Sequence, residues 1–304
     1  MTAFTLAHLS DPHLGPLPAV RWRELVSKRI LGYVNWHRRR VGSLGRRNLD
    51  ALVADIKAEP PNHIAVSGDL INLGLKAESD AARRWLDRLG DPEDVTVVPG
   101  NHDAYIPGAA RMVGHGWQPF MRGDNQPAGP TRFPFVRRRG PVAIIGVSTA
   151  VATAPFMATG RIRPSQSTRL AHLLAELGEE DRFRVVVLHH PPAIGSTKWH
   201  RRLIGAGVFR QAIKKSGAEL ILHGHNHRTA VDNVAGPTGP VPVVGATSAS
   251  LHPRDGLPGG SYLRFRIAST RDGFICDMTE HARRQDDGPV EVLSERRLIG
   301  RGAS

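Results

Sequence analysis

The chain has 304 residues, of which 40% are hydrophobic and 23% are charged, so it is long enough to bury a substantial core. Its net charge of +13 favours anionic partners, which include phosphate-bearing substrates, an acidic membrane surface and nucleic acid. The single cysteine, Cys276, excludes an internal disulfide, and no apolar run reaches the roughly 18 residues of a membrane-spanning helix. The N-terminus lacks the basic and apolar regions of a signal peptide, so we expect a cytoplasmic location.

Strand and helix patterns alternate along the chain until about residue 220, and strand patterns dominate beyond it. Short apolar or alternating runs predict strands at 4–9, 64–66, 95–98, 142–147, 184–188, 220–222, 241–244, 262–267 and 273–278. Apolar residues at helical spacing predict helices at 20–36, 44–58, 77–89, 165–177 and 207–216. This order predicts an α/β fold in which a mainly parallel sheet carries covering helices and is joined to a second sheet by the later strands.

The predicted domain organisation is a single domain over residues 1–280. It carries a basic amphipathic insertion at about 18–47 and an irregular insertion, rich in Gly, Pro and Arg, at about 105–140. Residues 281–304 are strongly charged and are predicted to form a partly frayed C-terminal tail. Ser165 is predicted to cap the helix that follows it.

Polar side chains follow directly after five of the predicted strands. These side chains are Asp11, His13, Asp69, Asn101, His102, His189, His225 and His227. Sites in open α/β sheets assemble at the carboxyl ends of the strands, so we expect these groups to meet at one edge. Oxygen and imidazole ligands without thiolate suit Fe, Mn, Zn or Ni better than Ca. Their number exceeds what one ion takes, which favours two metal ions.

Spacing supports a shared site, although each motif alone is compatible with an ordinary turn. Asp11-x-His13 and His225-x-His227 each place two ligands on the same side of an extended turn. A glycine precedes a candidate ligand at Gly68, Gly100 and Gly224 and permits a tight turn there. Taken singly, an Asp-Pro pair can cap a turn and a His-His pair can end a strand. Their joint occurrence after successive strands favours one metal centre.

The ordered set Asp11-x-His13, Gly68-Asp69, Gly100-Asn101-His102-Asp103, His189 and Gly224-His225-x-His227 resembles the calcineurin-like metallophosphoesterase superfamily. The resemblance spans about residues 4–250 and includes every motif of that family. It implies a four-layer αββα sandwich with two central mixed β-sheets. The order of the motifs and the His-His-Pro-Pro run at 189–192 look closest to the branch that contains cyclic-nucleotide and glycerophosphodiester phosphodiesterases.

The resemblance also implies roles for individual residues. One metal ion would be held by Asp11, His13 and His227, the other by Asn101, His189 and His225, and Asp69 would bridge the two ions. The first histidine of the His189-His190 pair is the ligand in the family pattern. His102 would lie near the leaving group, and Asp103 would orient it and fix its tautomer.

The expected activity is that of a dinuclear phosphohydrolase, most specifically a phosphodiesterase. A hydroxide that bridges the two cations would attack phosphorus in line, and His102 would assist the departing oxygen. A non-catalytic metal-binding scaffold is the opposing interpretation. It is disfavoured because superfamily members that became interaction modules usually lose ligands, whereas this chain has them all. The sequence leaves monoester, diester and pyrophosphate substrates open, together with the oligomeric state.

The basic segment at 20–47 carries the main clue to the substrate, because residues 21–47 contain nine basic residues and one acid. It is either a helix whose apolar stripe packs on the core, or an amphipathic helix on an anionic membrane with Trp22, Tyr33 and Trp36 at the interface. The second interpretation places a peripheral protein on the inner face of the membrane and favours a lipid-linked diester or pyrophosphate. Similar metallophosphoesterases cleave the pyrophosphate of a UDP-diacylglucosamine lipid A precursor.

Two further expectations concern partners. Nucleic acid is disfavoured, because aromatic residues make up only 6% of the chain and no motif for RNA or DNA binding is evident. His252 and Arg254, which follow the strand predicted at 241–244, are expected to contact the substrate.

Overall fold

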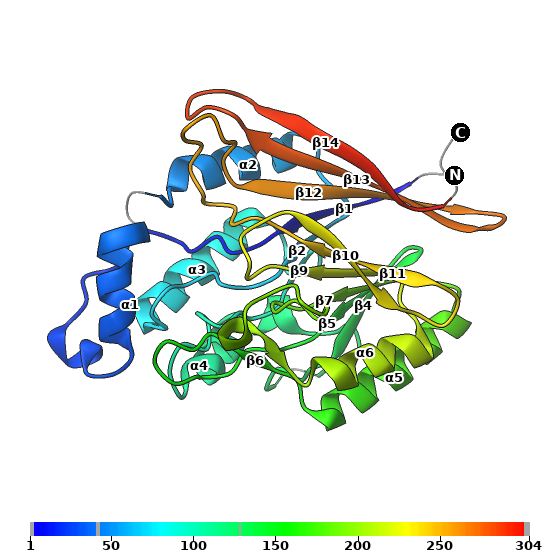
Figure 1. Cartoon of the computed structure of the whole chain (residues 1–304), viewed down its shortest axis with the longest axis horizontal. Coiled ribbons are helices and arrows are strands. Elements are labelled where there is room, and N and C mark those ends of the chain that lie inside the picture. Colours follow the sequence, from blue (N-terminus) through cyan, green and yellow to red (C-terminus); the bar gives the residue numbers. More distant parts are fainter. Residues whose placement is uncertain (1–2, 41–42, 128, 301–304) are drawn as a thin grey trace.

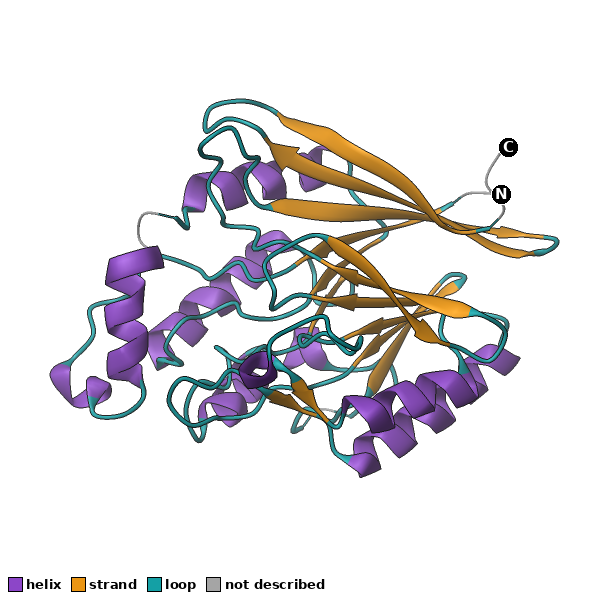
Figure 2. Ribbon diagram, viewed as in Figure 1, coloured by secondary structure: helices purple, strands orange, loops and turns teal. Residues whose placement is uncertain are grey.

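The computed structural model describes residues 3–40, 43–127 and 129–300. Two six-stranded sheets face each other, and helices cover their outer faces (Figures 1 and 2). The strand order is β14-β13-β12-β1-β2-β3 in the first sheet and β10-β11-β9-β7-β5-β4 in the second. Both sheets mix parallel and antiparallel pairs. This arrangement confirms the predicted four-layer αββα fold.

The strands and helices have the following bounds. The first sheet contains β1 (Phe4–Leu9), β2 (His63–Val66), β3 (Val95–Val97), β12 (Ser261–Thr270), β13 (Gly273–Arg283) and β14 (Val290–Ile299). The second contains β4 (Phe135–Arg139), β5 (Val142–Gly146), β7 (Phe183–Val187), β9 (Leu220–His223), β10 (Ala230–Ala235) and β11 (Pro240–Gly245), and a separate pair is formed by β6 (Gly160–Arg161) and β8 (Leu203–Ile204). The helices are α1 (Arg29–Asn35), α2 (Arg46–Ala58), α3 (Lys76–Leu89), α4 (Ala109–Gly116), α5 (Pro164–Glu179) and α6 (Ala206–Ser216).

Three apolar clusters hold the four layers together. The cluster between the sheets includes Leu6, Ile144, Val185 and Leu222, all fully buried. Because the parallel strands β5, β7 and β9 are covered on both faces, their sequences are nearly continuous apolar runs rather than alternating ones. A second cluster joins α5 and α6 to the second sheet. The sheets therefore pack on each other through an apolar core, and amphipathic helices form the two outer layers of the protein.

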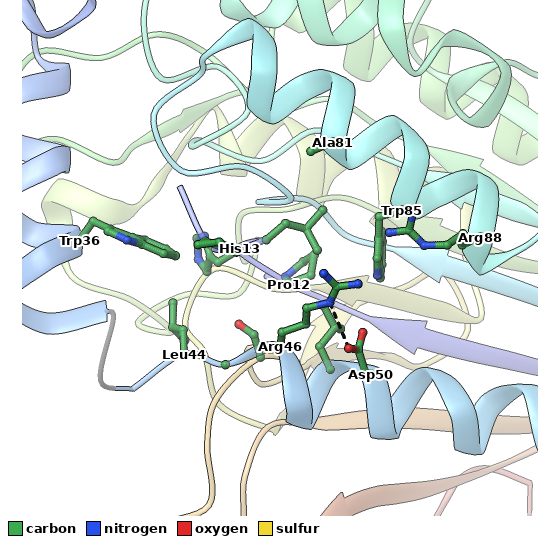
Figure 3. Close-up of a pocket in the computed structure, with 15 residues that line it drawn as sticks. Pro12, His13, Trp36, Leu44, Arg46, Asp50, Ala81, Trp85 and Arg88 are labelled. Atoms are coloured by element: carbon green, nitrogen blue, oxygen red, sulfur yellow. Dashed lines mark hydrogen bonds and ion pairs between the residues drawn. The ribbon is translucent and has the colours of Figure 1, made fainter. Parts of the chain in front are cut away.

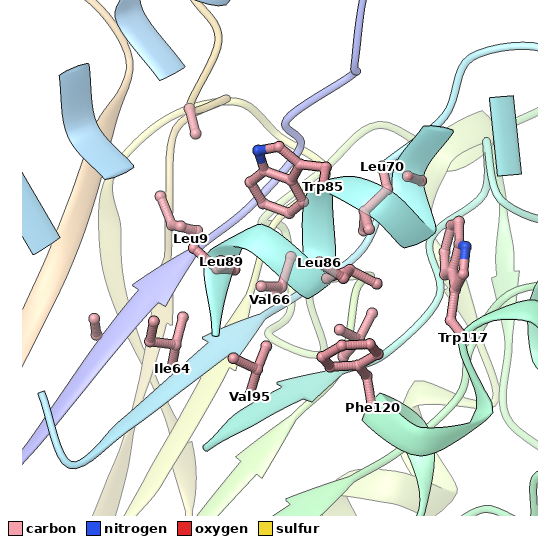
Figure 4. Packing of buried hydrophobic residues seen from close by; sticks show 14 of the residues in the cluster. Leu9, Ile64, Val66, Leu70, Trp85, Leu86, Leu89, Val95, Trp117 and Phe120 are labelled. Atoms are coloured by element: carbon pink, nitrogen blue, oxygen red, sulfur yellow. The ribbon is translucent and has the colours of Figure 1, made fainter. Parts of the chain in front are cut away.

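The third cluster packs α3 on the first sheet (Figure 4). Trp85, Leu86 and Leu89 of α3 lie in one buried cluster with Ile64 and Val66 of β2. Their spacing places them on one face of the helix, as the sequence predicts. This packing anchors the segment between β2 and α3, which carries one of the candidate metal ligands.

The prediction that residues 281–304 form a partly frayed tail is wrong over most of this segment. Residues 290–299 form β14, which pairs antiparallel with β13 at the edge of the first sheet. The strand is charged because an edge strand leaves many side chains in water, and Arg297 pairs with Asp277 across the ladder at 2.7 Å. Backbone pairing with β13, which the composition does not reveal, decides the structure of this segment.

Two other segments differ from the prediction. The region at 105–140 is not wholly irregular, since it contains α4 and β4.

The helix predicted at 20–36 is broken into a 3₁₀ turn at Trp22–Leu25 and the short α1. At the start of α1 the side chain of Arg29 donates hydrogen bonds to the carbonyls of Leu73 and Gly74, at 2.9 and 2.6 Å. That contact ties α1 to the body of the protein.

The start of α5 also differs from the prediction. Arg163 occupies the N-cap position and Pro164 the first turn, so Ser165 lies inside the helix and does not cap it. Proline is favoured at this position because its fixed φ suits a helix start and its missing N–H is not needed there. Among the residues that the structure describes, no helix is long and apolar enough to cross a bilayer.

Candidate metal centre

The eight candidate residues lie together at the carboxyl ends of strands from both sheets. Asp11 and His13 follow β1, Asp69 follows β2, and Asn101 and His102 follow β3. His189 follows β7, and His225 and His227 follow β9. The side chains of these residues are buried, except for the partly buried His102 and for His227, whose side chain is 31% exposed. The two sheets thus bring groups from distant parts of the chain to one place.

The first group consists of Asp11, His13 and His227. His227 Nε2 lies 3.0 Å from Asp11 Oδ1 and 3.3 Å from His13 Nε2. His13 Nε2 lies 3.8 Å from the same carboxylate oxygen. Three ligand atoms that face one another at these separations can surround a single cation, as the sequence predicts for this group.

The second group consists of Asn101, His189 and His225. His189 Nε2 lies 3.2 Å from Asn101 Oδ1 and 3.2 Å from His225 Nδ1. The other histidine of the pair, His190, is buried, and its Nδ1 lies 2.8 Å from Thr149 Oγ1. This contact engages only one ring nitrogen, and His190 also forms a possible metal-holding group with His189 and His225, so the geometry alone does not choose between the two histidines.

Asp69 lies between the two groups. Its Oδ2 is 3.9 Å from His13 Nε2 and 3.4 Å from His189 Nε2. Burial raises the pKa of this carboxyl, but the charges of His189 and His102 outweigh burial and hold the pKa well below its usual range. The oxygen and imidazole donors therefore fit two metal ions that share Asp69.

Hydrogen bonds select the nitrogen that each buried imidazole presents. His189 Nδ1 donates to the Ser67 carbonyl at 2.7 Å, which leaves Nε2 to face Asn101. His225 Nε2 donates to the Arg201 carbonyl at 3.0 Å, which leaves Nδ1 to face His189. Carbonyl oxygens accept only, so each ring carries a proton on its outer nitrogen, and the neutral form of each ring would turn a lone pair inward. Both rings are thus prepared to ligate a metal.

The backbone of the candidate ligands is unusual. Asp11, His13, Asp69, His225 and His227 all have positive φ, between 38° and 68°. Few residues other than glycine adopt this region, and such conformations concentrate at functional sites where the surroundings impose them. The strain sits on the candidate ligands themselves, which supports a function for this geometry.

Gly224 is required because the loop after β1 approaches its Cα closely, and not because its backbone has a positive φ. A Cβ at this position would lie 1.8 Å from Ser10 Oγ and 2.3 Å from Asp11 Oδ2. At Gly68 both requirements apply, because φ is +95° and a Cβ would lie 2.5 Å from the Gly100 nitrogen. The glycines before the ligands therefore bring the loops of the two sheets into contact.

Gly224→Ala is expected to lower the metal content of the purified protein, because the added methyl group must displace Asp11 or the loop after β9. Metal per chain measured by mass spectrometry checks this expectation. Gly239→Ala is the matched control, since a Cβ there meets nothing within 4 Å. Equal metal content in the two variants would contradict the crowding argument.

His102 and Asp103 have separate surroundings. His102 Nδ1 donates to the Asn72 carbonyl at 2.7 Å, and its ring stacks on Tyr105 with centroids 5.3 Å apart. The ring also meets His13 edge-on at 5.0 Å. His102 therefore stands beside the first group of ligands, held by a backbone carbonyl that no sequence motif marks.

Asp103 organises the loops. Its carboxylate accepts hydrogen bonds from the backbone N–H groups of Asp69, Leu70, Ile71 and Gly100, at 2.7 to 3.1 Å. Burial, followed by the charge of Asp69, raises the pKa of Asp103 to about 7. Asp103 therefore holds the backbone of these loops and does not fix the tautomer of His102 as predicted, because the Asn72 carbonyl accepts the hydrogen bond from that ring.

The expected substrate contacts, His252 and Arg254, lie elsewhere. His252 Nδ1 is 3.3 Å from Asp286 Oδ1, and its ring covers Gly45. Arg254 is exposed in a turn that pairs with Leu257. Neither residue lines the cavities beside the candidate ligands.

Two cavities adjoin the candidate centre. The first, here called the His13 cavity, has a volume of about 310 Å³ and runs from His13 past Trp36 and Leu44 towards Trp85 (Figure 3). The second, called the His102 cavity, has a volume of about 490 Å³ and includes Asn101 and His102. Both volumes lie within the range of small-molecule sites.

Comparison with known proteins gives consistent matches. A family model described as calcineurin-like phosphoesterase matches residues 4–229. A probable cyclic nucleotide phosphodiesterase from Synechococcus is 30% identical over 184 residues, which cover 60% of this chain. The chain spans 64% of the length of that relative.

Two solved structures show the same fold. A dimetal phosphatase from Danio rerio is 12% identical, with a TM-score of 0.59 over 97% of this chain and 99% of that chain. A purple acid phosphatase from yellow lupin (Lupinus luteus) seeds is 10% identical, with a TM-score of 0.62 over 97% of this chain and 53% of that chain. At these identities the likeness concerns the fold alone.

Proposed function

The chain belongs to the calcineurin-like phosphoesterase family, and we propose that within it the protein is a dinuclear metal-dependent phosphodiesterase for a small-molecule substrate. The observation that carries the proposal is the pair of ligand groups that share Asp69. Asp11, His13 and His227 would hold one ion, and Asn101, His189 and His225 the other. The name of the Synechococcus relative supports phosphodiesters as the first substrates to test.

Different residues of the chain would have different roles in the reaction. Metal ions bound at the two groups would supply Lewis-acid polarisation of the phosphoryl oxygens and lower the pKa of an attacking water. His102 lines the adjoining cavity with Nδ1 held by the Asn72 carbonyl, so its other nitrogen is the one placed to protonate the departing oxygen. Asp103 positions the loops that carry Asp69 and Asn101.

The proposal is tested with bis-p-nitrophenyl phosphate. The purified chain, stripped of metal and reconstituted separately with Mn²⁺, Fe²⁺, Zn²⁺ or Ni²⁺, is expected to release p-nitrophenolate with at least one of these ions. Metal per chain should approach two in the active preparation. Absence of turnover with all four ions would reject the enzyme and leave the metal-binding scaffold. A panel of cyclic nucleotides and glycerophosphodiesters then ranks natural substrates.

A second candidate function, hydrolysis of a lipid-linked diester or pyrophosphate at a membrane surface, is supported by the surface of the basic insertion. Val26, Ile30 and Val34 recur every four residues, so the last two share one face of α1, and they are 74%, 51% and 41% exposed. Trp22 is 71% exposed beside the exposed Arg21 and Arg23. An apolar face with adjacent cations suits an anionic bilayer. Trp36, in contrast, is buried and cannot serve as an interfacial anchor.

The membrane proposal is tested by cosedimentation with phosphatidylglycerol vesicles. The double variant Val26→Asp/Ile30→Asp is expected to lower the partition coefficient by roughly 10-fold or more, because two apolar side chains no longer enter the interface. Val292→Asp is the control, since Val292 is 52% exposed on β14. Equal partition of the double variant and the unchanged chain would remove the membrane proposal.

A further inference from the structure

Trp36 separates the His13 cavity from the His102 cavity. Among the residues that the structure describes, it is the one that lines both cavities, and it is only 6% exposed. A Cβ on Gly15 would lie 3.1 Å from the indole ring, so the ring is packed closely against the loop after β1. In Figure 3 the indole lies beside His13, with Leu44 next to it. The candidate centre therefore has a separate cavity on each side of a tryptophan.

The two cavities differ in chemistry. The wall of the His13 cavity is largely apolar and is formed by Leu14, Trp36, Leu44, Leu49, Ala81 and Trp85. Arg46, which pairs with Asp50 at 3.1 Å, and the exposed Arg88 also line it (Figure 3). This cavity suits an apolar group that is attached to a phosphate.

The His102 cavity is more polar. Lys28, Arg38, Asn35 and Asn72 contribute to its lining together with Tyr105, and the apolar side chains Leu31, Val34, Phe156 and Met157 also line it. Lys28 Nζ donates to Thr153 Oγ1 at 2.8 Å and to the Met157 carbonyl at 3.0 Å, which joins the basic insertion to the loop before β6. This cavity suits a polar group, and His102 in its wall is the residue placed to protonate a departing oxygen.

We propose that the substrate is an acyclic phosphodiester whose apolar arm is retained in the His13 cavity and whose polar arm departs through the His102 cavity. The inference rests on the proposed phosphodiesterase function. A phosphomonoester has one organic arm, and a cyclic nucleotide carries both ester oxygens on one sugar, so neither fills two separated cavities. The water oxygen forms a new bond to phosphorus as the bond to the polar arm breaks, and the water releases one proton to solvent, which replaces the proton that His102 gives up. The polar arm leaves as an alcohol with a proton from His102, and the apolar arm remains on a monoester.

The experiment varies the retained arm while the leaving group stays constant. Methyl p-nitrophenyl phosphate and hexyl p-nitrophenyl phosphate are compared on the metal-reconstituted chain, with p-nitrophenyl phosphate as the one-arm reference. The hexyl ester is expected to exceed the methyl ester in kcat/KM by roughly 10-fold or more, since about two buried methylene groups supply that factor. 3′,5′-Cyclic AMP is expected to be a poorer substrate than the hexyl ester.

Ala81→Phe places a ring in the His13 cavity and is expected to lower kcat/KM for the hexyl ester much more than for the methyl ester, so that the advantage of the hexyl ester is lost. Arg84→Phe, at an exposed position of the same helix, is the matched control. Equal kcat/KM for the two esters on the unchanged chain would overturn the inference, as would an Ala81→Phe variant that keeps the hexyl preference. Absence of turnover of every ester would reject the proposed function and this inference with it.

Discussion

Replacing Asp69 by asparagine is expected to remove at least one metal ion and nearly all phosphodiesterase activity. Asp69 lies between the two ligand groups, with Oδ2 3.9 Å from His13 Nε2 and 3.4 Å from His189 Nε2. Asparagine keeps the shape of the side chain but removes the negative charge. Loss of an outer hydrogen-bond partner of a metal ligand costs about 10- to 100-fold in affinity, so loss of a shared ligand is expected to exceed that range.

The measurement for Asp69→Asn is metal per chain together with turnover of bis-p-nitrophenyl phosphate. Asp87→Asn is the matched control, because Asp87 is an exposed acid on α3 that pairs with Arg83 at 2.9 Å. The side-chain amide of the Asp69→Asn variant can still accept the hydrogen bond that the backbone N–H of His102 donates to Asp69 Oδ1 at 2.7 Å. The loop that carries residue 69 is therefore expected to keep its structure. A variant with two metal ions and undiminished turnover would show that Asp69 does not bridge the ions.

Replacing His102 by alanine is expected to keep both metal ions and to lower turnover by roughly 10²- to 10⁴-fold, the usual contribution of a general acid or base. His102 Nδ1 is held by the Asn72 carbonyl, and the ring lies beside the first ligand group without belonging to it. The loss should be greater for esters with an alkyl leaving group than for p-nitrophenyl esters, because an alkoxide needs a proton more than a phenolate does. Kinetics with both leaving groups test this expectation.

The competing role for His102 is that of a metal ligand. Its ring can also contribute an atom to a group with His13 and Asp69. Loss of metal from His102→Ala would assign it that role, and an equal loss of activity with both leaving groups would argue against proton transfer. His172→Ala on the exposed side of α5 controls for general effects of losing an imidazole.

Several local features of the fold were predictable because they depend on short-range pattern. The strand Phe4–Leu9 was predicted at its observed bounds, and the helix predicted at 77–89 begins one residue earlier, at Lys76. Continuous apolar runs identify strands that are buried on both faces, and helical spacing identifies one buried face. The helix predicted at 20–36 is interrupted at Val26, whose ψ of 67° is not helical, and tertiary contacts from Arg29 to the carbonyls of Leu73 and Gly74 hold the second half in place. β14 was missed because pairing at a sheet edge leaves little apolar signal.

The sequence by itself determined which side chains form the candidate centre. Each one follows a short apolar strand, and the carboxyl ends of parallel strands lie at one edge of their sheet, while the packing of the two sheets brings their two edges together. Only the tertiary structure decided what surrounds them. The carbonyl of Asn72 holds His102, and Asp103 collects four backbone N–H groups. Trp36 divides two cavities instead of facing a membrane. Backbone carbonyls carry no residue-specific signal, and the burial of a tryptophan depends on contacts between segments far apart in the chain.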